Sequence, residues 1–214
     1  MDNQEFVFAG KRRHLANILE KKGINDKKVL SAIAQVPRHL FIDEGLVHHA
    51  YTDKALQIGS GQTISQPYTV AFQSQLLQVR ENDKILEIGT GSGYQAAILS
   101  QMKAKVYSIE RYKDLHLNAK NLLRKLKYQV KLFYGDGYEG LPAYAPFDKI
   151  IITAGASEIP KSLLLQLKIG GIMVIPLTKK DYQEMVKIVK VSERDFEMTK
   201  HGEFRFVPML HGKV

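Results

Sequence analysis

From residue 84 onward, short apolar runs alternate with longer stretches whose apolar residues recur every three or four positions. The short runs predict buried strands at 84–88, 105–109, 129–134, 148–153 and 171–176. The longer stretches predict helices at 93–102, 113–126 and 160–168. Unbroken apolar runs, such as the isoleucines at 150–152, suit parallel strands that are buried on both faces. This alternation predicts a doubly wound, mostly parallel α/β sheet with its ligand site at the carboxyl ends of the strands.

The two ends of the chain differ from this alternating core. On the N-terminal side, apolar faces predict helices at 11–22, from 26 to 36, and from about 65 to 77. Gly23 is a natural helix stop, and Asn25 or Asp26 can cap the second helix. Residues 38–63 have no clear period and are expected to form short elements and loops. On the C-terminal side, 185–191 and 204–209 are strand-like without a helix between them, which predicts an antiparallel pair.

Composition describes an ordinary globular chain, with 44% hydrophobic and 25% charged residues among 214. This length suits one domain, which we divide into an N-terminal helical segment (1–80) and an α/β core (81–214). No apolar run approaches the roughly 20 residues of a membrane helix, and the first residues lack the apolar stretch of a secretory signal. Cysteine is absent, which excludes disulfides, thiolate metal sites and cysteine nucleophiles. We therefore expect a cytoplasmic protein with no membrane partner.

The formal net charge of +9 has three interpretations. It is typical of a nucleic-acid partner, of a solvated basic surface, or of a protein that attracts acidic substrates. Lysine and arginine are spread along the chain, with only small groups such as 11–13 and 179–180, and no aromatic residues interleave a basic stripe. We favour the solvated surface and expect no nucleic-acid partner.

The segment 86–93, Leu-Glu-Ile-Gly-Thr-Gly-Ser-Gly, joins a predicted strand to a predicted helix. Its glycines let the backbone approach a ligand closely, and the helix start offers free N–H groups. The spacing Gly-x-Gly-x-Gly differs from the Gly-x-Gly-x-x-Gly of dinucleotide sites, although the loop by itself leaves NAD binding open. It resembles motif I of the S-adenosylmethionine-dependent methyltransferases.

Two acidic residues at the ends of the next strands support a nucleoside ligand. Glu110 ends the following strand about twenty residues on, where its carboxylate can accept from both ribose hydroxyls. Asp136 lies between two glycines after the third strand and can accept from an adenine amino group. Each feature has a plainer explanation as a tight turn or a solvated carboxylate, but their order and spacing favour one ligand site.

Elimination narrows the group that accepts the methyl. Adenine or glutamine N-methylation uses an Asn/Asp-Pro-Pro-aromatic motif after the fourth strand, where this chain has Thr-Ala-Gly-Ala at 153–156. Base C5-methylation needs a cysteine, and no lysine-centred set for ribose methylation is evident. A carboxylate remains: with a pKa near ~4 it is already ionised at neutral pH. Such an enzyme has only to align its acceptor and exclude water.

The segment 59–67, Gly-Ser-Gly-Gln-Thr-Ile-Ser-Gln-Pro, is the candidate acceptor site. It combines glycines, hydroxyl donors and a helix start whose free N–H groups favour anions. Ser65 could orient an acceptor or cap the following helix. These roles compete because one hydroxyl donates one proton.

The segments 61–68 and 86–95 together resemble the protein-L-isoaspartate O-methyltransferases. The similarity continues through 36–38, 135–138, 145–148, 153–156, 170–171 and 206–209. It implies a Rossmann-like methyltransferase sheet of about seven strands with an antiparallel C-terminal strand and an N-terminal helical addition. It also implies an enzyme that uses S-adenosyl-L-methionine, leaving S-adenosyl-L-homocysteine, to methylate the α-carboxylate of L-isoaspartyl residues in damaged proteins. The ester then closes to a succinimide, which hydrolyses partly to normal aspartate.

The same resemblance implies the site residues. Ser65 is the expected catalytic or acceptor-orienting residue. The cofactor is expected to be bound by Gln62, Thr63, Ile64, Tyr68, Glu87, Gly89, Thr90, Gly91, Ser92, Glu110, Arg111, Asp136 and Gly137. The acceptor peptide is expected to contact Thr63, Ser65, Val207, Pro208 and Met209. Leu210 stands where some relatives have a polar cofactor contact and is left out of the site.

Isoaspartyl peptides and proteins are the expected partners, and a monomer is the expected state. No metal is expected, because the adjacent His48 and His49 point different ways on a regular element. Two rivals remain. The net charge suggests an RNA methyltransferase, and a non-catalytic binding protein could keep the same fold, although the intact loop with Glu110 and Asp136 argues against the latter.

Overall fold

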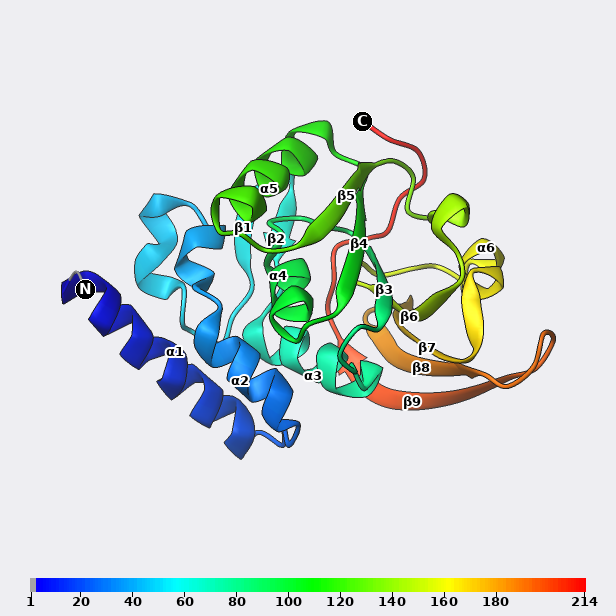
Figure 1. The fold of residues 1–214 in the computed structure, drawn as a ribbon, viewed down its shortest axis with the longest axis horizontal. Coiled ribbons are helices and arrows are strands. Elements are labelled where there is room, and N and C mark those ends of the chain that lie inside the picture. Colours follow the sequence, from blue (N-terminus) through cyan, green and yellow to red (C-terminus); the bar gives the residue numbers. More distant parts are fainter. Residues whose placement is uncertain (1–2) are drawn as a thin grey trace.

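The computed structural model describes residues 3–214 and has an α/β architecture (Figure 1). Its helices are α1 (Asn3–Lys21), α2 (Lys27–Gln35), α3 (Pro67–Leu77), α4 (Tyr94–Gln101), α5 (Lys113–Lys125) and α6 (Lys161–Leu165), with 3-10 turns η1 (Arg38–Phe41), η2 (Glu44–His49) and η3 (Pro142–Tyr144). Its strands are β1 (Leu56–Gly59), β2 (Gln62–Ile64), β3 (Lys84–Ile88), β4 (Lys105–Glu110), β5 (Val130–Tyr134), β6 (Phe147–Ile152), β7 (Leu167–Thr178), β8 (Gln183–Lys190) and β9 (Phe196–Phe204).

The main sheet of residues 3–214 has seven strands in the order β5-β4-β3-β6-β7-β8-β9. The strands from β5 to β7 are parallel, whereas β8 is antiparallel to both of its neighbours. This confirms the predicted doubly wound, mostly parallel fold. The chain runs from β3 outward to β5, and then returns to place β6 on the other side of β3. Ligands of such sheets bind where the strand order reverses in this way, at the carboxyl ends of the strands.

The core lies on both faces of the central strands. Ile85 and Ile151 pack into the apolar cluster formed with α1 to α5, whereas Leu86 and Ile150 pack into the cluster that includes Leu163 of α6. Successive strand residues point to opposite faces, so continuous apolar runs are required here. All four side chains are fully buried.

The N-terminal addition agrees with its predicted outline but not with its predicted start. Helix α1 begins at Asn3, eight residues before the predicted start. Its first turn is largely polar, and the helix is stabilised there by contacts that an apolar pattern does not reveal. Phe8 stacks on His39, and Glu5 pairs with Arg12. The Asp26 carboxylate accepts hydrogen bonds from the first turn of α2, which confirms it as the N-cap. Residues 38–63 form two 3-10 turns and the β1–β2 hairpin, as expected of short elements.

The C-terminal strands depart from the prediction in one place. Strand β8 is antiparallel to its partner as expected, but that partner is β9 at Phe196–Phe204 and not the predicted 204–209. Strand β9 is an edge strand whose residues are mostly solvent-exposed, so its sequence lacks the apolar pattern of a buried strand. In the described chain, the only β-pairing of the residues after β9 is an isolated parallel bridge between Gly155 and Pro208. In residues 3–214, no helix combines the length and apolar character needed to cross a membrane.

Candidate active site

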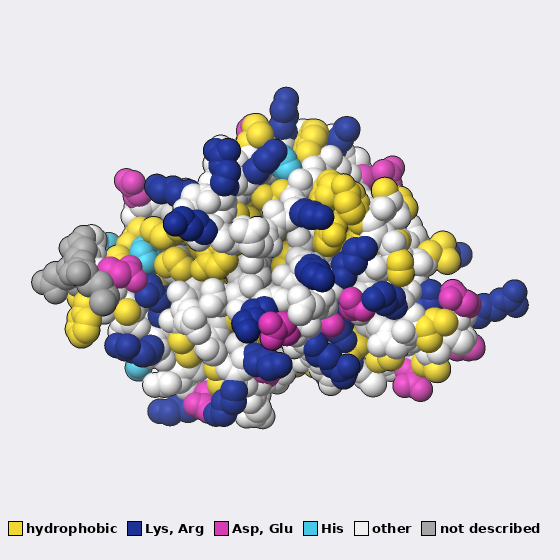
Figure 2. Space-filling view, viewed as in Figure 1, with side chains coloured by type: hydrophobic (Ala, Val, Ile, Leu, Met, Phe, Trp, Pro, Cys, Tyr) yellow, Lys and Arg dark blue, Asp and Glu magenta, His cyan; other side chains and the backbone are white. Residues whose placement is uncertain are grey.

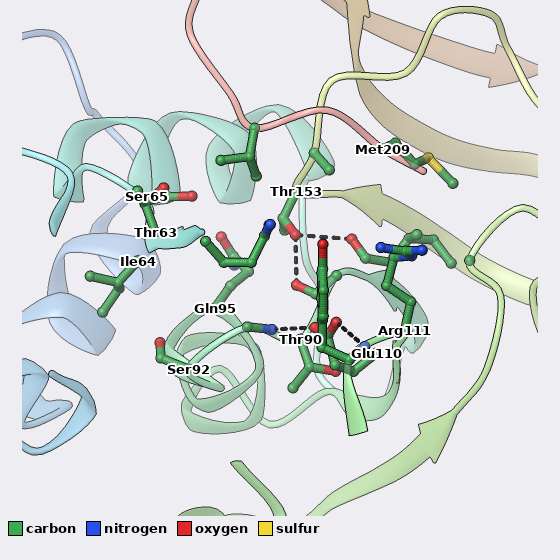
Figure 3. A pocket seen from close by; sticks show the side chains of 18 of the residues that line it. Thr63, Ile64, Ser65, Thr90, Ser92, Gln95, Glu110, Arg111, Thr153 and Met209 are labelled. Carbon is green, nitrogen blue, oxygen red and sulfur yellow. Dashed lines mark hydrogen bonds between the residues drawn. The ribbon is translucent and has the colours of Figure 1, made fainter. Parts of the chain in front are cut away.

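A cavity of about 800 Å³, including its open mouth, lies at the carboxyl ends of β3, β4 and β6 (Figure 3). One wall is the glycine-rich turn 89–92 that follows β3. The opposite wall is the segment 62–65, which leads from β2 to α3. Residues 207–210, after β9, form a third wall. The cavity thus occupies the point of strand reversal where the sheet topology predicts a ligand.

The glycine-rich turn is packed tightly against the end of β6. Gly89 has a φ of +95°, and a Cβ placed on it would lie 2.6 Å from Oγ1 of Thr153. The Thr153 hydroxyl donates to the carbonyl oxygens of Ile88 and Gly89, at 2.9 and 2.7 Å. A side chain at residue 89 would therefore be strained and would displace the threonine that fixes the turn.

The Glu110 carboxylate joins the turn to the end of β4. Its Oε2 accepts from the N–H of Gly91 at 2.8 Å, and its Oε1 accepts from the N–H of Tyr112 at 2.9 Å. A carboxylate oxygen has two lone pairs, so each oxygen keeps one acceptor position. Glu110 lines the cavity and can therefore accept from a pair of hydroxyl groups there.

Ser65 lies across the cavity from the glycine-rich turn, on the same wall as Thr63 and Ile64 (Figure 3). In the described structure, α3 has Gln66 as its N-cap and no side-chain capping hydrogen bond. The capping role for Ser65 is therefore wrong. The helix begins with Pro67 in its first turn, whose missing N–H requires no partner. The Ser65 hydroxyl therefore makes no capping hydrogen bond to the start of α3.

Most of the predicted site residues lie together on the cavity wall. They are Gln62, Thr63, Ile64, Ser65, Gly89, Thr90, Gly91, Ser92, Glu110, Arg111, Gly137, Val207, Pro208 and Met209. Their individual roles toward a ligand stay predictions.

Three predicted residues are not on this wall. Glu87 is fully buried, and burial raises its pKa to about 8, with the nearby Glu110 charge adding to the rise and the Ser108 hydroxyl opposing it. Tyr68 instead donates its N–H to Asp53 at 2.8 Å and stacks on Phe72. Neither residue lines the cavity, and their contacts with a cofactor stay predictions.

Asp136 is the third, and its carboxylate holds the chain's last residues. Its Oδ1 accepts from the N–H of Tyr138 at 2.8 Å, and its Oδ2 accepts from the N–H of Gly212 at 2.6 Å. The Arg111 guanidinium donates to the carbonyls of His211 and Gly212, both at 3.1 Å. The tail from residue 210 to 214 is thereby fixed beside the cavity by two residues that the sequence assigned to the cofactor.

The cavity also contains residues that sequence reasoning missed. Thr153, Gln95 and Tyr94 line it, as does Leu210, which was left out of the site. Thr153 directly follows a predicted parallel strand, so its position at the strand end could have identified it. Gln95 gives no such signal, because it occupies a buried position in α4 and its Nε2 donates to Ser74.

These features fit a nucleoside that carries an amino acid. A close-packed glycine turn faces one end of the cavity, and a carboxylate with free acceptor positions stands at the end of β4. The doubly wound sheet and this site, at the point of strand reversal, are those of a nucleotide-binding α/β protein.

Comparison with known proteins identifies the family. The family model for protein-L-isoaspartate(D-aspartate) O-methyltransferase matches residues 10–214. The chain belongs to this family.

Similar proteins agree with that assignment. The protein-L-isoaspartate O-methyltransferase of Christiangramia forsetii is 55% identical over 205 residues, which cover 95% of this chain and 96% of the relative. A solved protein-L-isoaspartate O-methyltransferase structure has a TM-score of 0.84 at 30% identity, covering 92% of this chain and 65% of the solved chain. A Plasmodium falciparum structure named for the same activity, in complex with S-adenosyl-L-homocysteine, has a TM-score of 0.82 at 26% identity and covers 93% and 98% of the two chains.

Proposed function

We propose that this chain transfers a methyl group from S-adenosyl-L-methionine to the α-carboxylate of L-isoaspartyl residues in damaged peptides and proteins. The observation that carries the proposal is the placement of Ser65, whose hydroxyl is free of the helix cap and shares a cavity with Glu110 and the glycine-rich turn. Acceptor and cofactor groups are thereby brought to one cavity. Membership of the isoaspartate methyltransferase family supports the same substrate.

The cofactor side of the cavity is assigned to three groups. Glu110 binds the ribose hydroxyls with the acceptor positions left by Gly91 and Tyr112. The turn from Gly89 to Ser92 is assigned to the amino-acid part, which its glycines allow the backbone to approach closely. When bound, S-adenosylmethionine supplies a methyl group made electrophilic by a sulfonium sulfur.

The acceptor carboxylate is held by Ser65 and requires no base from the protein. The Ser65 hydroxyl donates to one carboxylate oxygen, which leaves the other to form the new O–C bond as the methyl–sulfur bond breaks. The bonding electrons go to sulfur, and no proton moves. Rate enhancement then comes from alignment and exclusion of water.

The third wall offers backbone to an extended acceptor chain. The Gly155 N–H donates to the Val207 carbonyl, and the Gly155 carbonyl accepts from the Met209 N–H, both at 2.8 Å. Successive residues of an extended segment present their backbone groups to opposite edges, so the Pro208 carbonyl points away from Gly155. Pro208 lines the cavity, and its carbonyl is the group we assign to an acceptor peptide.

One assay tests the proposed function. Labelled S-adenosylmethionine is incubated with an isoaspartyl peptide and, as control, with the matched aspartyl peptide. The expected result is label on the isoaspartyl peptide that is lost at mildly alkaline pH, because carboxyl esters hydrolyse there. Equal labelling of both peptides, or label that resists alkali, would contradict the proposal.

We also propose that the enzyme acts as a cytoplasmic monomer, with residues 1–80 carrying the acceptor segment and 81–214 the cofactor core of a single domain. A solvated basic surface supports the absence of a nucleic-acid partner: Lys and Arg side chains are spread over the face in Figure 2, with acidic side chains among them. Light scattering at two protein concentrations tests the monomer, and methyl incorporation into RNA tests the nucleic-acid alternative.

A further inference from the structure

Arg38 is a fully buried arginine located behind the acceptor wall. It begins the 3-10 turn η1, and its side chain has no exposed surface. Its Nη2 donates to the carbonyl of Ser65 at 2.9 Å and reaches the carbonyl of Lys54 at 3.4 Å. Its guanidinium lies over the ring of Tyr94, 4.8 Å from the centroid. One side chain thus touches the acceptor segment on one side and the first residue of α4 on the other.

Burying this charge is costly to the fold. Burial lowers the pKa of Arg38, an effect opposed by Tyr94, Asp53 and Tyr51. Asp53, the carboxylate among these, already pairs with Lys22 at 2.6 Å. Among the described residues, Nε and Nη1 of Arg38 have no hydrogen-bond partner. An apolar side chain of similar size would avoid this cost, but it would leave the Ser65 carbonyl without its donor.

The contacts of Arg38 indicate that its side chain positions the backbone of Ser65. The Ser65 carbonyl belongs to the peptide plane that precedes Gln66, so fixing it fixes the backbone from which the Ser65 hydroxyl projects. The helix cap does not perform this task, because α3 lacks a side-chain cap in the described structure. Tyr94 lines the cavity directly after the glycine-rich turn. Arg38 therefore sets the position of the acceptor wall relative to the cofactor wall.

We propose that Arg38 is a positioning residue for methyl transfer: it holds the Ser65 backbone against the start of α4, so that the serine hydroxyl presents the acceptor carboxylate in line with the methyl group. It does not itself contact either reactant. Because this role rests on the proposed acceptor site, its test must separate misplacement of Ser65 from loss of cofactor binding and from loss of stability.

The test compares Arg38→Met with Arg12→Met, using an isoaspartyl peptide and S-adenosylmethionine. Arg12 is a suitable control because it is also buried, has unpartnered Nε and Nη1 atoms, and pairs with Glu5 on α1, away from the cavity wall. For Arg38→Met, kcat/KM should fall by about 10- to 100-fold, the scale of a misplacement of about 1 Å. Its Kd for S-adenosylhomocysteine should stay within about threefold of wild type. Arg12→Met should keep the wild-type kcat/KM.

Arg38→Lys provides the conservative comparison. Lysine keeps the charge and one donor but loses the planar group that stacks on Tyr94, so kcat/KM should lie between those of wild type and Arg38→Met. If Arg38→Met does not fold, Arg38→Lys decides alone, and it should show reduced kcat/KM with unchanged Kd for S-adenosylhomocysteine.

Three results would overturn the positioning role. They are a folded Arg38→Met with wild-type kcat/KM, an equal loss of S-adenosylhomocysteine affinity and kcat/KM, and a wild-type kcat/KM in Arg38→Lys when Arg38→Met is unfolded. Failure of the proposed function would look different, since wild-type enzyme would then leave the isoaspartyl peptide unmethylated. A Ser65→Ala variant with normal turnover would remove the acceptor assignment but not the family's reaction.

Discussion

The Glu110 carboxylate and the backbone of Gly91 are joined by a hydrogen bond of 2.8 Å, from the glycine N–H to Oε2. This bond ties the end of β4 to the turn that follows β3. The same carboxylate is the group assigned to the ribose hydroxyls. One side chain therefore both shapes the glycine-rich turn and offers acceptors to the ligand, and its removal should affect both.

Glu110→Ala should weaken cofactor binding by about 1–3 kcal/mol, the scale of hydrogen bonds to a charged group. Titration calorimetry with S-adenosylhomocysteine measures the change. Glu81→Ala is the matched control, because Glu81 is an exposed glutamate that pairs with Lys103. Unchanged affinity in Glu110→Ala would contradict the ribose assignment.

Ser65→Ala should lower kcat while leaving the Kd for S-adenosylhomocysteine near its wild-type value, because the hydroxyl is assigned to the acceptor and not to the cofactor. Steady-state kinetics with an isoaspartyl peptide and calorimetry separate the two effects. Ser31→Ala, at an exposed position of α2, controls for the loss of a hydroxyl. A parallel loss of turnover and cofactor affinity would count against the acceptor role.

Glu87 should make the folded state less stable as pH rises. Its folded pKa of about 8 exceeds its ordinary value of 4.5, so between these values the folded chain binds more protons than the unfolded chain. The stabilising contribution is fully present below pH 4.5 and is lost as pH rises through 8. Glu87→Gln, which cannot ionise, should be more stable than wild type at pH 8.5 by about 1 kcal/mol or more.

Denaturant unfolding of wild type and Glu87→Gln at pH 5 and pH 8.5 checks this, because other titrating groups cancel in the comparison. The stability difference should shift toward the variant as pH increases. A difference that does not depend on pH would show that Glu87 is not protonated in the folded state at neutral pH.

Asp136→Ala should release the C-terminal tail. The Gly212 and Tyr138 N–H groups lose their shared acceptor, which should cost about 1–3 kcal/mol of local stability. Hydrogen exchange should therefore become faster at both amides, while the amides of β3 keep wild-type rates. Asp114→Ala, in the first turn of α5, is the control. Unchanged exchange at Gly212 would mean that the other contacts of the tail, from the Arg111 side chain and from the backbone hydrogen bonds of Val214, are sufficient to secure it.

The pH profile should reflect the acceptor and not a histidine base. Among the described residues, no histidine lines the cavity. With a peptide acceptor, kcat/KM should be level from about pH 6 to 8 and should fall at acid pH as a carboxylate of pKa near ~4 is protonated. A profile that requires deprotonation of a group with a pKa near ~6.5 would instead identify a histidine.

The sequence predicts best those parts of the fold whose burial requires a recognisable pattern of apolar residues along the chain. Strands β3 and β6 are buried on both faces, and their apolar runs located them within one residue. Strand β9 was misplaced because an exposed edge strand needs no apolar pattern. The first turns of α1 were missed because Phe8 finds its partner, His39, about thirty residues away in the chain.

The site likewise contains residues that the sequence predicts and residues that it does not. Glycine turns and strand-end carboxylates carry a local signature, so residues such as Gly89 and Glu110 could be proposed from the chain alone. Asp136 has the same signature, but its bonds to the N–H groups of Tyr138 and of Gly212, 76 positions away, could not be predicted, and its contact with a cofactor stays a prediction. Gln95 has no such signature. Sequence spacing identifies which groups reach a strand end, whereas the pairing of those groups depends on segments that only the folded chain brings together.

The bridge between Gly155 and Pro208 bears on which damaged proteins can be repaired. Isoaspartate arises wherever a labile asparagine or aspartate occurs, so its neighbours in the polypeptide follow no consensus. A wall that offers a main-chain carbonyl recognises what all such polypeptides share and ignores what distinguishes them. With the Pro208 carbonyl assigned to the acceptor as proposed, broad tolerance for flanking sequence follows from the architecture, and discrimination is left to the geometry of the single kinked linkage.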